Sequence, residues 1–444
     1  MHDLLERANG QLRAAEPALF SALSPLGRRA LYPPDIPFQA AQAKNKTYNG
    51  TIGQITDGKG GAVPLAAMSA ALSGLSPAER NRALLYSPIE GFADVRRLWQ
   101  GWQRRGVAAD VPATLPLVVD GLTHGLALAA ELFAGEGRVV AVPTPYWGNY
   151  DQIFGLRLGA RVVSAPAYHD GQYDPRAIAR ALDGAGLAPG EPAVAILNVP
   201  SNPGGYSPTA AERTDLVASL LAVAAERPFV VICDDAYSGL VFEPAIPRLS
   251  PFWDLAGQHP NLIALKVDGT TKELSYFGGR VGFLTFGVAA DSPAVEVLES
   301  KVKCLVRAGV GSPVSTGQVL AVQALTAPDL DAQVAVVHEL LGRRFRALAA
   351  AFRALDRELL RPLPMNSGCF GLAELGPKAR DRGVTAEAIR QYLLEHEDTG
   401  VVAIGDDFVR VAFCSVDESA LPELVARLER GVAELARQAS PVRG

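Results

Sequence analysis

Residues 262–282 read LIALKVDGTTKELSYFGGRVG: an apolar run, a turn rich in glycine and threonine, and the start of a second apolar run. Stretches with a helical pattern, such as His124–Phe133 and Glu212–Glu226, lie between several runs of this kind. The apolar runs are Leu117–Val119, Val139–Val142, Ala193–Leu197, Phe229–Cys233, Leu262–Val267 and Val281–Phe286. Short apolar strands that alternate with helices are typical of a parallel sheet covered on both faces. This pattern predicts an α/β fold, with ligand sites at the carboxyl ends of the strands.

The flanking segments predict a different organisation. Residues 1–85 mix helical patches with loops rich in glycine and proline, and residues 292–358 are mostly helical. The last hundred residues predict a smaller α+β unit, built from Leu363–Ala373, Ala386–His396, Val409–Phe413 and Leu421–Arg437.

The composition excludes several classes of protein. A chain of 444 residues is too long for one average domain, and 48% apolar with 20% charged residues is typical of a globular protein. Lys and Arg number 42 and Asp and Glu 47, for a net charge of −5. This mild acidic excess argues against a nucleic-acid surface, which normally needs a basic stripe. No stretch reaches the roughly 18 uncharged apolar residues of a membrane span.

The cysteines and the first residues bear on location. The four cysteines, at positions 233, 304, 369 and 414, are far apart in the sequence, so we expect neither a disulfide scaffold nor a zinc site. The first residues, MHDLLERANGQLRAAEP, lack the apolar core of a signal peptide. We therefore expect a soluble cytoplasmic protein.

Residues suited to an anion or to a flat ring follow the first strands. Gly121–Gly125 (GLTHG) opens a helix, whose free N–H groups would suit a phosphate, although an ordinary β–α turn is the alternative. Trp147, within Pro143–Asn149, could stack on a flat ligand or could simply pack as a surface aromatic. Asn202 lies in the stretch after the next strand, which could also be a plain loop.

Charged residues follow the later strands. Asp234 comes after five apolar residues, and a buried carboxylate needs a partner such as a cationic ring nitrogen or an arginine. Lys272, one of only eight lysines against 34 arginines, lies in a small-residue turn where an amine could be desolvated and nucleophilic. Arg280 could bind a phosphate, although it and Lys272 could each be solvated surface cations. Arg410 stands inside the apolar run Phe408–Phe413 and needs an anion.

The order of these residues is more specific than any one of them. An anion-binding turn, an aromatic plate, an amide, a carboxylate, an amine and two guanidinium groups occupy successive strand ends. Pyridoxal 5'-phosphate requires a lysine for covalent attachment, a carboxylate at its ring nitrogen, a stacking ring and a phosphate cradle. We therefore expect pyridoxal phosphate as the cofactor.

With these residues the chain resembles the class I aminotransferases, and among them most the aspartate and aromatic amino-acid aminotransferase subgroup, over about residues 47–415. The matching motifs are Tyr48–Gly53 with Asp57-Gly-Lys and Pro64, Tyr86-Ser-Pro-Ile-Glu-Gly, Trp147-Gly-Asn, Asn202-Pro-Gly-Gly, Asp234-Asp-Ala-Tyr, and Thr271-Lys with Arg280-Val-Gly. The resemblance implies the aspartate-aminotransferase-like fold, pyridoxal-phosphate fold type I. A large domain over residues 66–335 would hold a mostly parallel seven-stranded sheet. Residues 1–65 and 336–444 would form a smaller α+β domain.

The resemblance also implies roles in cofactor binding. Lys272 would hold the cofactor covalently and, once released by the substrate, would move a proton to and from it. Asp234 would keep the ring nitrogen protonated, while Tyr237 and Asn202 would donate hydrogen bonds to the ring oxygen. Trp147 would stack on the ring, next to the substrate. The phosphate would be held by Gly121, Leu122, Thr123, Thr271 and Arg280.

Substrate binding and a partner subunit are implied as well. Arg410 would bind the substrate α-carboxylate together with the backbone of Gly53, Asn202 would lie beside it, and Phe370 would face the same pocket. Tyr86 would reach the phosphate of the neighbouring subunit, which implies a homodimer. Arg307, six residues before Pro313, matches the subgroup's arginine for a distal carboxylate. Its alternative role is to end the predicted helix 295–306, where a cation is favoured.

Three departures from the subgroup concern supporting residues. The serine usually found three residues before the lysine is Gly269, so that phosphate contact would be missing or supplied by Thr270. The histidine that supports the aspartate is Tyr150, and the threonine of Asn-Pro-Thr-Gly is Gly204. They leave the roles of the lysine, the aspartate and the last arginine unchanged.

These residues predict a dimeric aminotransferase with ping-pong kinetics. Glutamate and 2-oxoglutarate would be one substrate pair, and aspartate or an aromatic amino acid would belong to the other. Two alternatives stay open: a pyridoxal-phosphate lyase or decarboxylase that uses the same residues, and a non-catalytic ligand sensor on the same fold.

Overall fold

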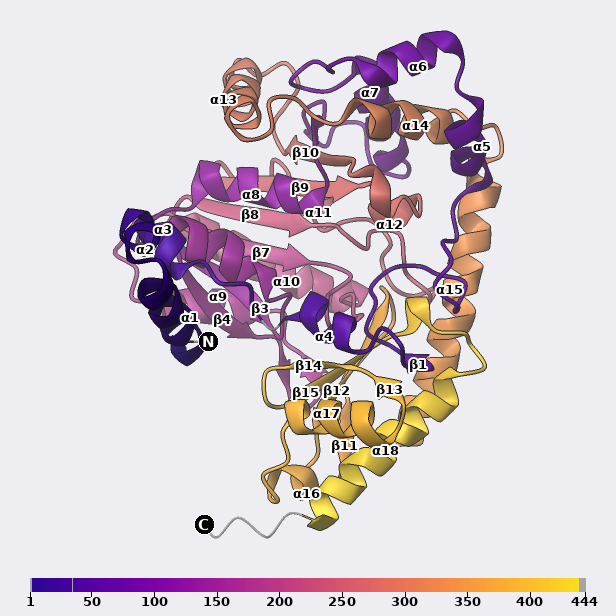
Figure 1. Ribbon diagram of the computed structural model, residues 1–444. Helices are drawn as coiled ribbons and strands as arrows, with labels where there is room; N and C mark the ends of the chain where they lie inside the picture. The colour runs from indigo at the N-terminus through magenta and orange to yellow at the C-terminus, as the bar shows by residue number, and fades with distance from the viewer. Residues whose placement is uncertain (1, 34, 439–444) are drawn as a thin grey trace.

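The computed structural model describes residues 2–33 and 35–438, and its centre is a seven-stranded sheet (Figure 1). The strand order is β2-β10-β9-β8-β7-β3-β4, and all neighbours are parallel except β10, which runs antiparallel to β2 and β9. The strands are β2 (Leu117–Val119), β3 (Val139–Thr144), β4 (Arg161–Pro166), β7 (Ala193–Asn198), β8 (Phe229–Asp234), β9 (Leu262–Gly269) and β10 (Gly282–Phe286). The α/β fold with a mostly parallel sheet of seven strands is confirmed.

All six apolar runs of the sequence form strands of this sheet. The seventh strand, β4, did not stand out, and its exposure explains why. Most of its residues are partly or fully exposed, whereas β2, the strand at the opposite edge, is fully buried. A strand with so few buried residues needs no continuous apolar run.

Helices cover both faces of the sheet. On one face lies α8 (Leu122–Phe133); on the other lie α9 (Ala177–Asp183), α10 (Ala210–Glu226) and α11 (Phe252–Leu255). Successive strand residues alternate between the two faces, so Ile232 packs in the core with α8 and Cys233 in the core with α10 and α11.

Helices from two distant parts of the chain pack together beyond β2 and β10. These helices are α5 (Ala66–Gly74), α6 (Pro77–Leu84), α7 (Ala93–Gln103), α13 (Ala294–Gly309) and α14 (Ser315–Leu325). Among them, α14 packs against α5, α6 and α7. The helix α6 begins with a capping box, in which Ser76 and Glu79 each bond the other's backbone N–H.

A second sheet forms the smaller α+β unit. Its order is β11-β12-β15-β14, and every neighbouring pair is antiparallel. The strands are β11 (Leu360–Pro362), β12 (Phe370–Leu375), β14 (Val402–Ile404) and β15 (Phe408–Ala412), and the helices around them are α16 (Pro377–Arg380), α17 (Ala386–His396) and α18 (Leu421–Gln438). The short strand β1 (Tyr48–Asn49) pairs in parallel with β13 (Thr399–Gly400), which ties residues near position 50 to this unit.

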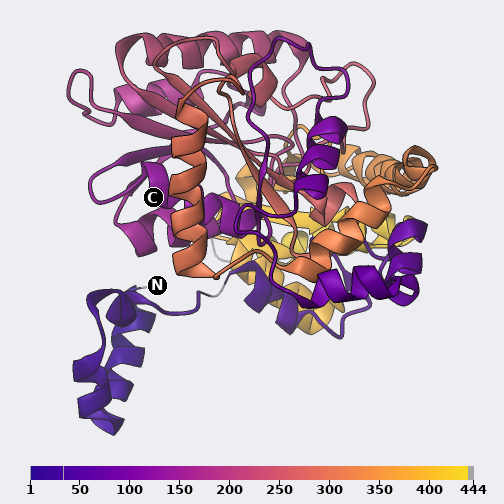
Figure 2. The same ribbon diagram turned by 90° about the horizontal axis from the view of Figure 1, so that it is seen from above.

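The long helix α15 (Leu330–Arg353) joins the two parts of the molecule (Figure 1). The predicted domain boundary between residues 335 and 336 falls inside this continuous helix, and the division into two domains stays a prediction. The helices α1 (His2–Ala15), α2 (Pro17–Ala22) and α3 (Pro25–Arg29) extend away from the rest of the chain (Figure 2). A hydrogen bond joins them to the segment between β3 and β4: Arg29 Nη2 donates to the Leu156 carbonyl at 3.4 Å.

Across residues 2–33 and 35–438, none of the helices combines the length and the apolar character that crossing a membrane requires.

Candidate active site

A cavity of about 560 Å³ lies at the carboxyl end of the large sheet, between the two parts of the molecule. It collects residues from three regions: strand ends of the large sheet, the small sheet, and the segment from α4 (Ile36–Gln42) to residue 54. The predicted site residues that line it are Gly53, Leu122, Thr123, Trp147, Asn202, Asp234, Tyr237, Thr271, Lys272, Arg280, Phe370 and Arg410. Predicted residues up to 357 positions apart in the sequence, Gly53 and Arg410, therefore meet in one place.

Asp234 ends β8 and is only 3% exposed. Its Oδ2 accepts a hydrogen bond from the Tyr150 hydroxyl at 2.5 Å, and its Oδ1 accepts one from the Ala236 N–H at 3.2 Å. Burial raises the pKa of Asp234, while the hydrogen bond from Tyr150 and the charge of Lys272 oppose that rise. Within the described residues no salt bridge neutralises this carboxylate, so a cationic ring nitrogen would suit it.

Two residues that hydrogen-bond Asp234, one at its carboxylate and one at its backbone carbonyl, lie outside the set predicted for the site. Tyr150 stands where the subgroup has histidine, and burial and the neighbouring Asp234 raise the pKa of its hydroxyl, which therefore remains a donor. Asn198 Nδ2 donates to the Asp234 carbonyl at 2.8 Å, and its Oδ1 accepts the Asn202 N–H at 2.6 Å. The departure from the subgroup's histidine thus keeps a hydrogen-bond donor at Asp234.

Lys272 lies in α12 (Thr270–Glu273), immediately after β9. Its Nζ is 4.8 Å from the ring centroid of Tyr237. Burial lowers the pKa of the Lys272 amine, and Asp234 partly opposes that effect. A lowered pKa increases the neutral, nucleophilic fraction of the amine, as covalent chemistry with an aldehyde requires.

An anion cradle lies beside Lys272. Gly121 caps the start of α8 with a φ of 80°, and a Cβ there would collide with the guanidinium of Arg280. The hydroxyl of Thr271 is buried and has no hydrogen-bond partner among the described residues. A helix N-terminus, a guanidinium and a free hydroxyl that face one cavity fit a phosphate dianion.

The replacement of serine by Gly269 has a steric explanation. A Cβ at position 269 would lie 2.6 Å from the Val281 carbonyl oxygen and 3.0 Å from Leu122 Cδ1, so the backbone leaves no room for a side chain. Thr270 does not replace the missing hydroxyl, because it is fully buried and donates to the Val281 carbonyl at 3.3 Å instead of lining the cavity.

Arg410 is a buried guanidinium without a carboxylate partner among the described residues. It is 1% exposed; Nη1 donates to Asn202 Oδ1 at 3.2 Å and Nη2 to the Thr51 carbonyl at 2.9 Å, while Nε has no partner. Burial lowers its pKa to about 10. Its Cζ lies 4.3 Å from the ring centroid of Phe370. Such a cation suits a carboxylate that enters the cavity.

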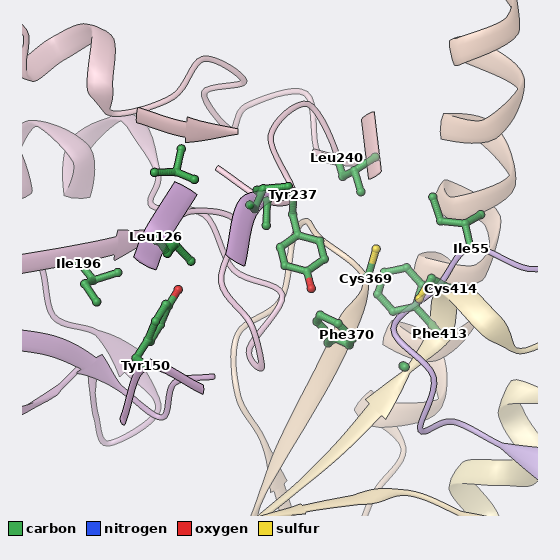
Figure 3. Close-up of a cluster of buried hydrophobic side chains, with 14 of the residues drawn as sticks. Ile55, Leu126, Tyr150, Ile196, Tyr237, Leu240, Cys369, Phe370, Phe413 and Cys414 are labelled. Atoms are coloured by element: carbon green, nitrogen blue, oxygen red, sulfur yellow. The ribbon is translucent and has the colours of Figure 1, made fainter. Parts of the chain in front are cut away.

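Aromatic and thiol side chains close the site toward the small sheet (Figure 3). The rings of Tyr237 and Phe370 pack edge to face with centroids 5.4 Å apart. Behind them the buried side chains of Cys369 and Cys414 share a hydrogen bond, although 45 positions separate them in the sequence, and both are free thiols.

Three predicted residues do not line the cavity. Gly121 stands behind Arg280 in the cradle. Tyr86 is 93% exposed, and Arg307 is exposed in the last turn of α13. Neither side chain reaches the cavity of its own chain, so their action on a neighbouring subunit stays a prediction.

Several of the residues that sequence reasoning missed come from α4. Ile36, Pro37 and Ala40 cover the cavity with apolar atoms, together with Ile52 and Phe277. The only sequence signal for α4 was a helical patch among loops, which does not reveal where the helix packs.

Comparisons with known proteins identify the family of the chain and agree with its fold. The family model described as aminotransferase class I and II matches residues 49–428. A 2-aminoadipate transaminase from Thermus thermophilus is 29% identical over 378 residues, 79% of this chain and 82% of that protein. An aspartate aminotransferase from Rhizobium meliloti is 28% identical over 357 residues, 77% and 80% of the two chains. The crystal structure of an aminotransferase from Anaerococcus prevotii aligns with a TM-score of 0.79 at 18% identity, over 92% of this chain and 98% of that one.

Proposed function

Because the chain belongs to the class I and II aminotransferases, pyridoxal-phosphate enzymes that transfer an amino group from an amino acid to a 2-oxo acid, we propose that the cavity around Lys272 is its active site. The aspartate-aminotransferase-like fold and the cofactor expected from the sequence are confirmed. The observation that carries the proposal is one cavity that holds a desolvated lysine, a buried aspartate and an unpaired buried arginine.

The residues fit the cofactor part by part. When bound, pyridoxal phosphate supplies an aldehyde that reacts with amines and a ring that withdraws electrons from the substrate carbon. Asp234 would face the ring nitrogen, with Tyr150 holding the carboxylate in place. The turn at Leu122 and Thr123 would hold the phosphate together with the side chains of Thr271 and Arg280.

Lys272 would then be both the attachment point and the base. Its lowered pKa makes the amine able to take a proton from the substrate α-carbon, and Tyr237 lies beside it to orient the amine. Arg410 would hold the substrate α-carboxylate, so that every substrate would bind in the same orientation. Because Asn202 already bonds Arg410, it would couple the bound carboxylate to the cofactor ring.

For substrates, we propose glutamate and 2-oxoglutarate as one pair and aspartate or an aromatic amino acid in the other. The apolar cover from α4, with Ile36 and Ala40, supports an aromatic side chain, which would gain from burial there. An acidic side chain would need a cation, and the proposed source is Arg307 of a second subunit. The relatives named above act on aminoadipate and aspartate, both of which carry a distal carboxylate.

The experiment is a single-turnover panel of glutamate, aspartate, phenylalanine and alanine, followed by loss of the absorption band of the lysine-bound cofactor. We expect the band to disappear as one equivalent of 2-oxo acid forms per site, and to return when 2-oxoglutarate is added. Consumption of amino acid while the band persists would instead favour a lyase or decarboxylase. Lys272→Ala should abolish the band altogether, and its retention would refute the lysine assignment.

A homodimer with shared sites is part of the proposal. Tyr86 is preceded by two more exposed apolar side chains, Leu84 and Leu85, which are 84% and 59% exposed. Such a run is typical of an interface. Light scattering tests the dimer. Arg307→Gln tests the shared site, because it should lower activity toward aspartate and glutamate at least about tenfold more than activity toward phenylalanine. A cytoplasmic location stays a prediction from the sequence.

A further inference from the structure

A network of polar side chains lies behind Lys272, on the face of the sheet opposite Asp234. Lys266 pairs in register with Cys233, whose side chain packs under α10 and α11, so Lys266 and Asp268 point to that same face. Asp235 follows Asp234 and turns to the same side, toward Lys266. We call the set the Lys266 network; its members are Trp102, Gln103, Asp235, Lys266, Asp268 and Glu273.

The contacts form a continuous path from Lys266 to the residue next to Lys272. Lys266 Nζ bonds the Asp268 carboxylate, lies 3.5 Å from Asp235 Oδ2 and donates to Gln103 Oε1 at 2.8 Å. Gln103 Nε2 in turn donates to Glu273 Oε2 at 2.8 Å. The same oxygen accepts the indole N–H of Trp102 at 2.9 Å. The amide of Gln103 therefore has one orientation, with its oxygen toward the ammonium and its nitrogen toward the carboxyl group.

The helix that carries Lys272 depends on contacts of this kind. With four residues, α12 is too short to be stable on its own. Lys272 also lines two cavities, the catalytic one and a second of about 330 Å³ that Gln103 and Glu273 line as well. With open space on two sides, packing alone fixes the helix less firmly than in a filled core. The bonds from Trp102 and Gln103 to Glu273 tie it to the end of α7.

The composition of the network argues for a functional reason. Lys266, Asp235 and Asp268 are each 1% exposed, and one ammonium pairs with two carboxyl groups, while Gln103 links it to a third, that of Glu273. Burial raises the pKa of Asp235 to about 7 and that of Glu273 to about 8. Apolar side chains would fill such a place at a smaller desolvation cost. Two members of the network are instead sequence neighbours of the proposed site residues: Asp235 follows Asp234, and Glu273 follows Lys272.

We infer that Glu273, Gln103 and Lys266 are positioning residues for Lys272. Lys266 orients the amide of Gln103, and Gln103 with Trp102 holds the carboxyl group of Glu273, which fixes the turn of helix from which Lys272 reaches the cofactor. The inference rests on the proposed role of Lys272 in cofactor attachment. A displacement of the amine by about 1 Å is enough to slow a bond-forming step on the order of 100-fold.

The test measures covalent attachment apart from binding. Cofactor-free protein is mixed with pyridoxal phosphate, the attached fraction is trapped with borohydride over time, and the labelled lysine is identified by peptide mass spectrometry. Affinity for pyridoxine phosphate, which has the same ring and phosphate but no aldehyde, reports noncovalent binding alone. Gln103→Leu and Glu273→Leu should slow attachment by between about 10-fold and 100-fold and change pyridoxine phosphate affinity by less than about twofold.

Matched variants separate positioning from general damage. Glu273→Gln keeps an oxygen for both donors and should attach the cofactor within about threefold of the wild-type rate. Glu299→Leu is the control, because it removes another tether of α7, the 2.7 Å ion pair with Arg96, without touching α12. It should leave the attachment rate unchanged.

If Gln103→Leu does not fold, as judged by thermal melting, the double variant Lys266→Met with Asp268→Asn replaces it, because it removes the ion pair and frees Gln103 together. Attachment at the wild-type rate in either folded variant overturns the inference. A slowed rate accompanied by an equal loss of pyridoxine phosphate affinity also overturns it. Attachment of the wild-type protein at another lysine would overturn the proposed function as well, which separates the two failures.

Discussion

Tyr150→Phe removes a single hydroxyl from the site and tests the account of Asp234. The lost bond joins the Tyr150 hydroxyl to Asp234 Oδ2 at 2.5 Å, in a place where Tyr150 is 1% exposed and water cannot readily replace it. Hydrogen bonds to charged groups contribute about 1.5–3 kcal/mol. Since about 1.4 kcal/mol is a factor of ten, affinity for pyridoxal phosphate should fall about 10-fold to 100-fold.

The same substitution has a pH signature. The Tyr150 hydroxyl stabilises the ionised carboxylate, so its removal raises the pKa of Asp234 further above its ordinary value. The Asp234 carboxylate, which we propose pairs with the ring nitrogen, then becomes protonated at a higher pH than in the wild type. The acidic limb of cofactor binding should therefore move to higher pH in the variant.

The assay is fluorescence titration of the cofactor-free protein with pyridoxal phosphate, repeated from about pH 5 to pH 9. Tyr146→Phe is the matched control, because its hydroxyl donates to Asp151 at 2.9 Å and Tyr146 does not line the catalytic cavity. The control should bind like the wild type. If Tyr150→Phe binds within twofold of the wild type with the same acidic limb, the reasoning about Asp234 is refuted.

Three further predictions follow from the site. Arg410→Leu should lower kcat/KM for every amino acid by about 100-fold or more while the lysine-bound cofactor band persists, because one charged partner of each substrate carboxylate is lost; equal rates in stopped flow would contradict this role. Gly269→Ser should lower the melting temperature and cofactor affinity, because the new Cβ would press on the Val281 carbonyl at 2.6 Å; unchanged melting would contradict the steric explanation. The folded state raises the pKa of Asp235 from 3.8 to about 7 and that of Glu273 from 4.5 to about 8, so it holds these protons more tightly than the unfolded state. The contribution of these two groups to stability is therefore greatest at low pH and is lost as the pH rises from about 4 to about 8. For Asp235 alone the loss is roughly 4 kcal/mol at about 1.4 kcal/mol for each pKa unit, as urea unfolding of cofactor-free wild type against Asp235→Asn would measure.

The convergence of the cofactor residues could be predicted from sequence for a topological reason. Parallel strands bring their carboxyl ends to one edge of the sheet. Residues at or shortly after strand ends, such as Asn202, Asp234 and Lys272, can therefore be expected to lie close together without any knowledge of packing. The need of Arg410 for an anionic partner could also be predicted from the sequence, because a charge inside an apolar strand needs a partner wherever the strand lies.

The remaining parts of the site depend on packing that a linear pattern does not contain. The cover supplied by Ile36, Pro37 and Ala40 comes from a short helix far from the strands, and its apolar residues would look the same on any buried surface. Whether Tyr150 could replace a histidine depended on the 2.5 Å reach of its hydroxyl. The absence of room beside Gly269 depended on the position of another strand's carbonyl group.

The pairing of Tyr48–Asn49 with Thr399–Gly400 joins a segment that is synthesised early to one that is synthesised late. The residues of the cofactor cradle, from Leu122 to Arg280, are all synthesised long before Arg410. Thr51, whose carbonyl accepts a hydrogen bond from Arg410, is synthesised early, whereas Arg410 is synthesised late. Since nascent chains fold from the N-terminus onward, a growing chain can assemble the cradle while it still has no means of gripping a substrate carboxylate. On the roles proposed above, a chain that ends before Arg410 would contain the cradle residues but would lack the arginine that holds the substrate carboxylate.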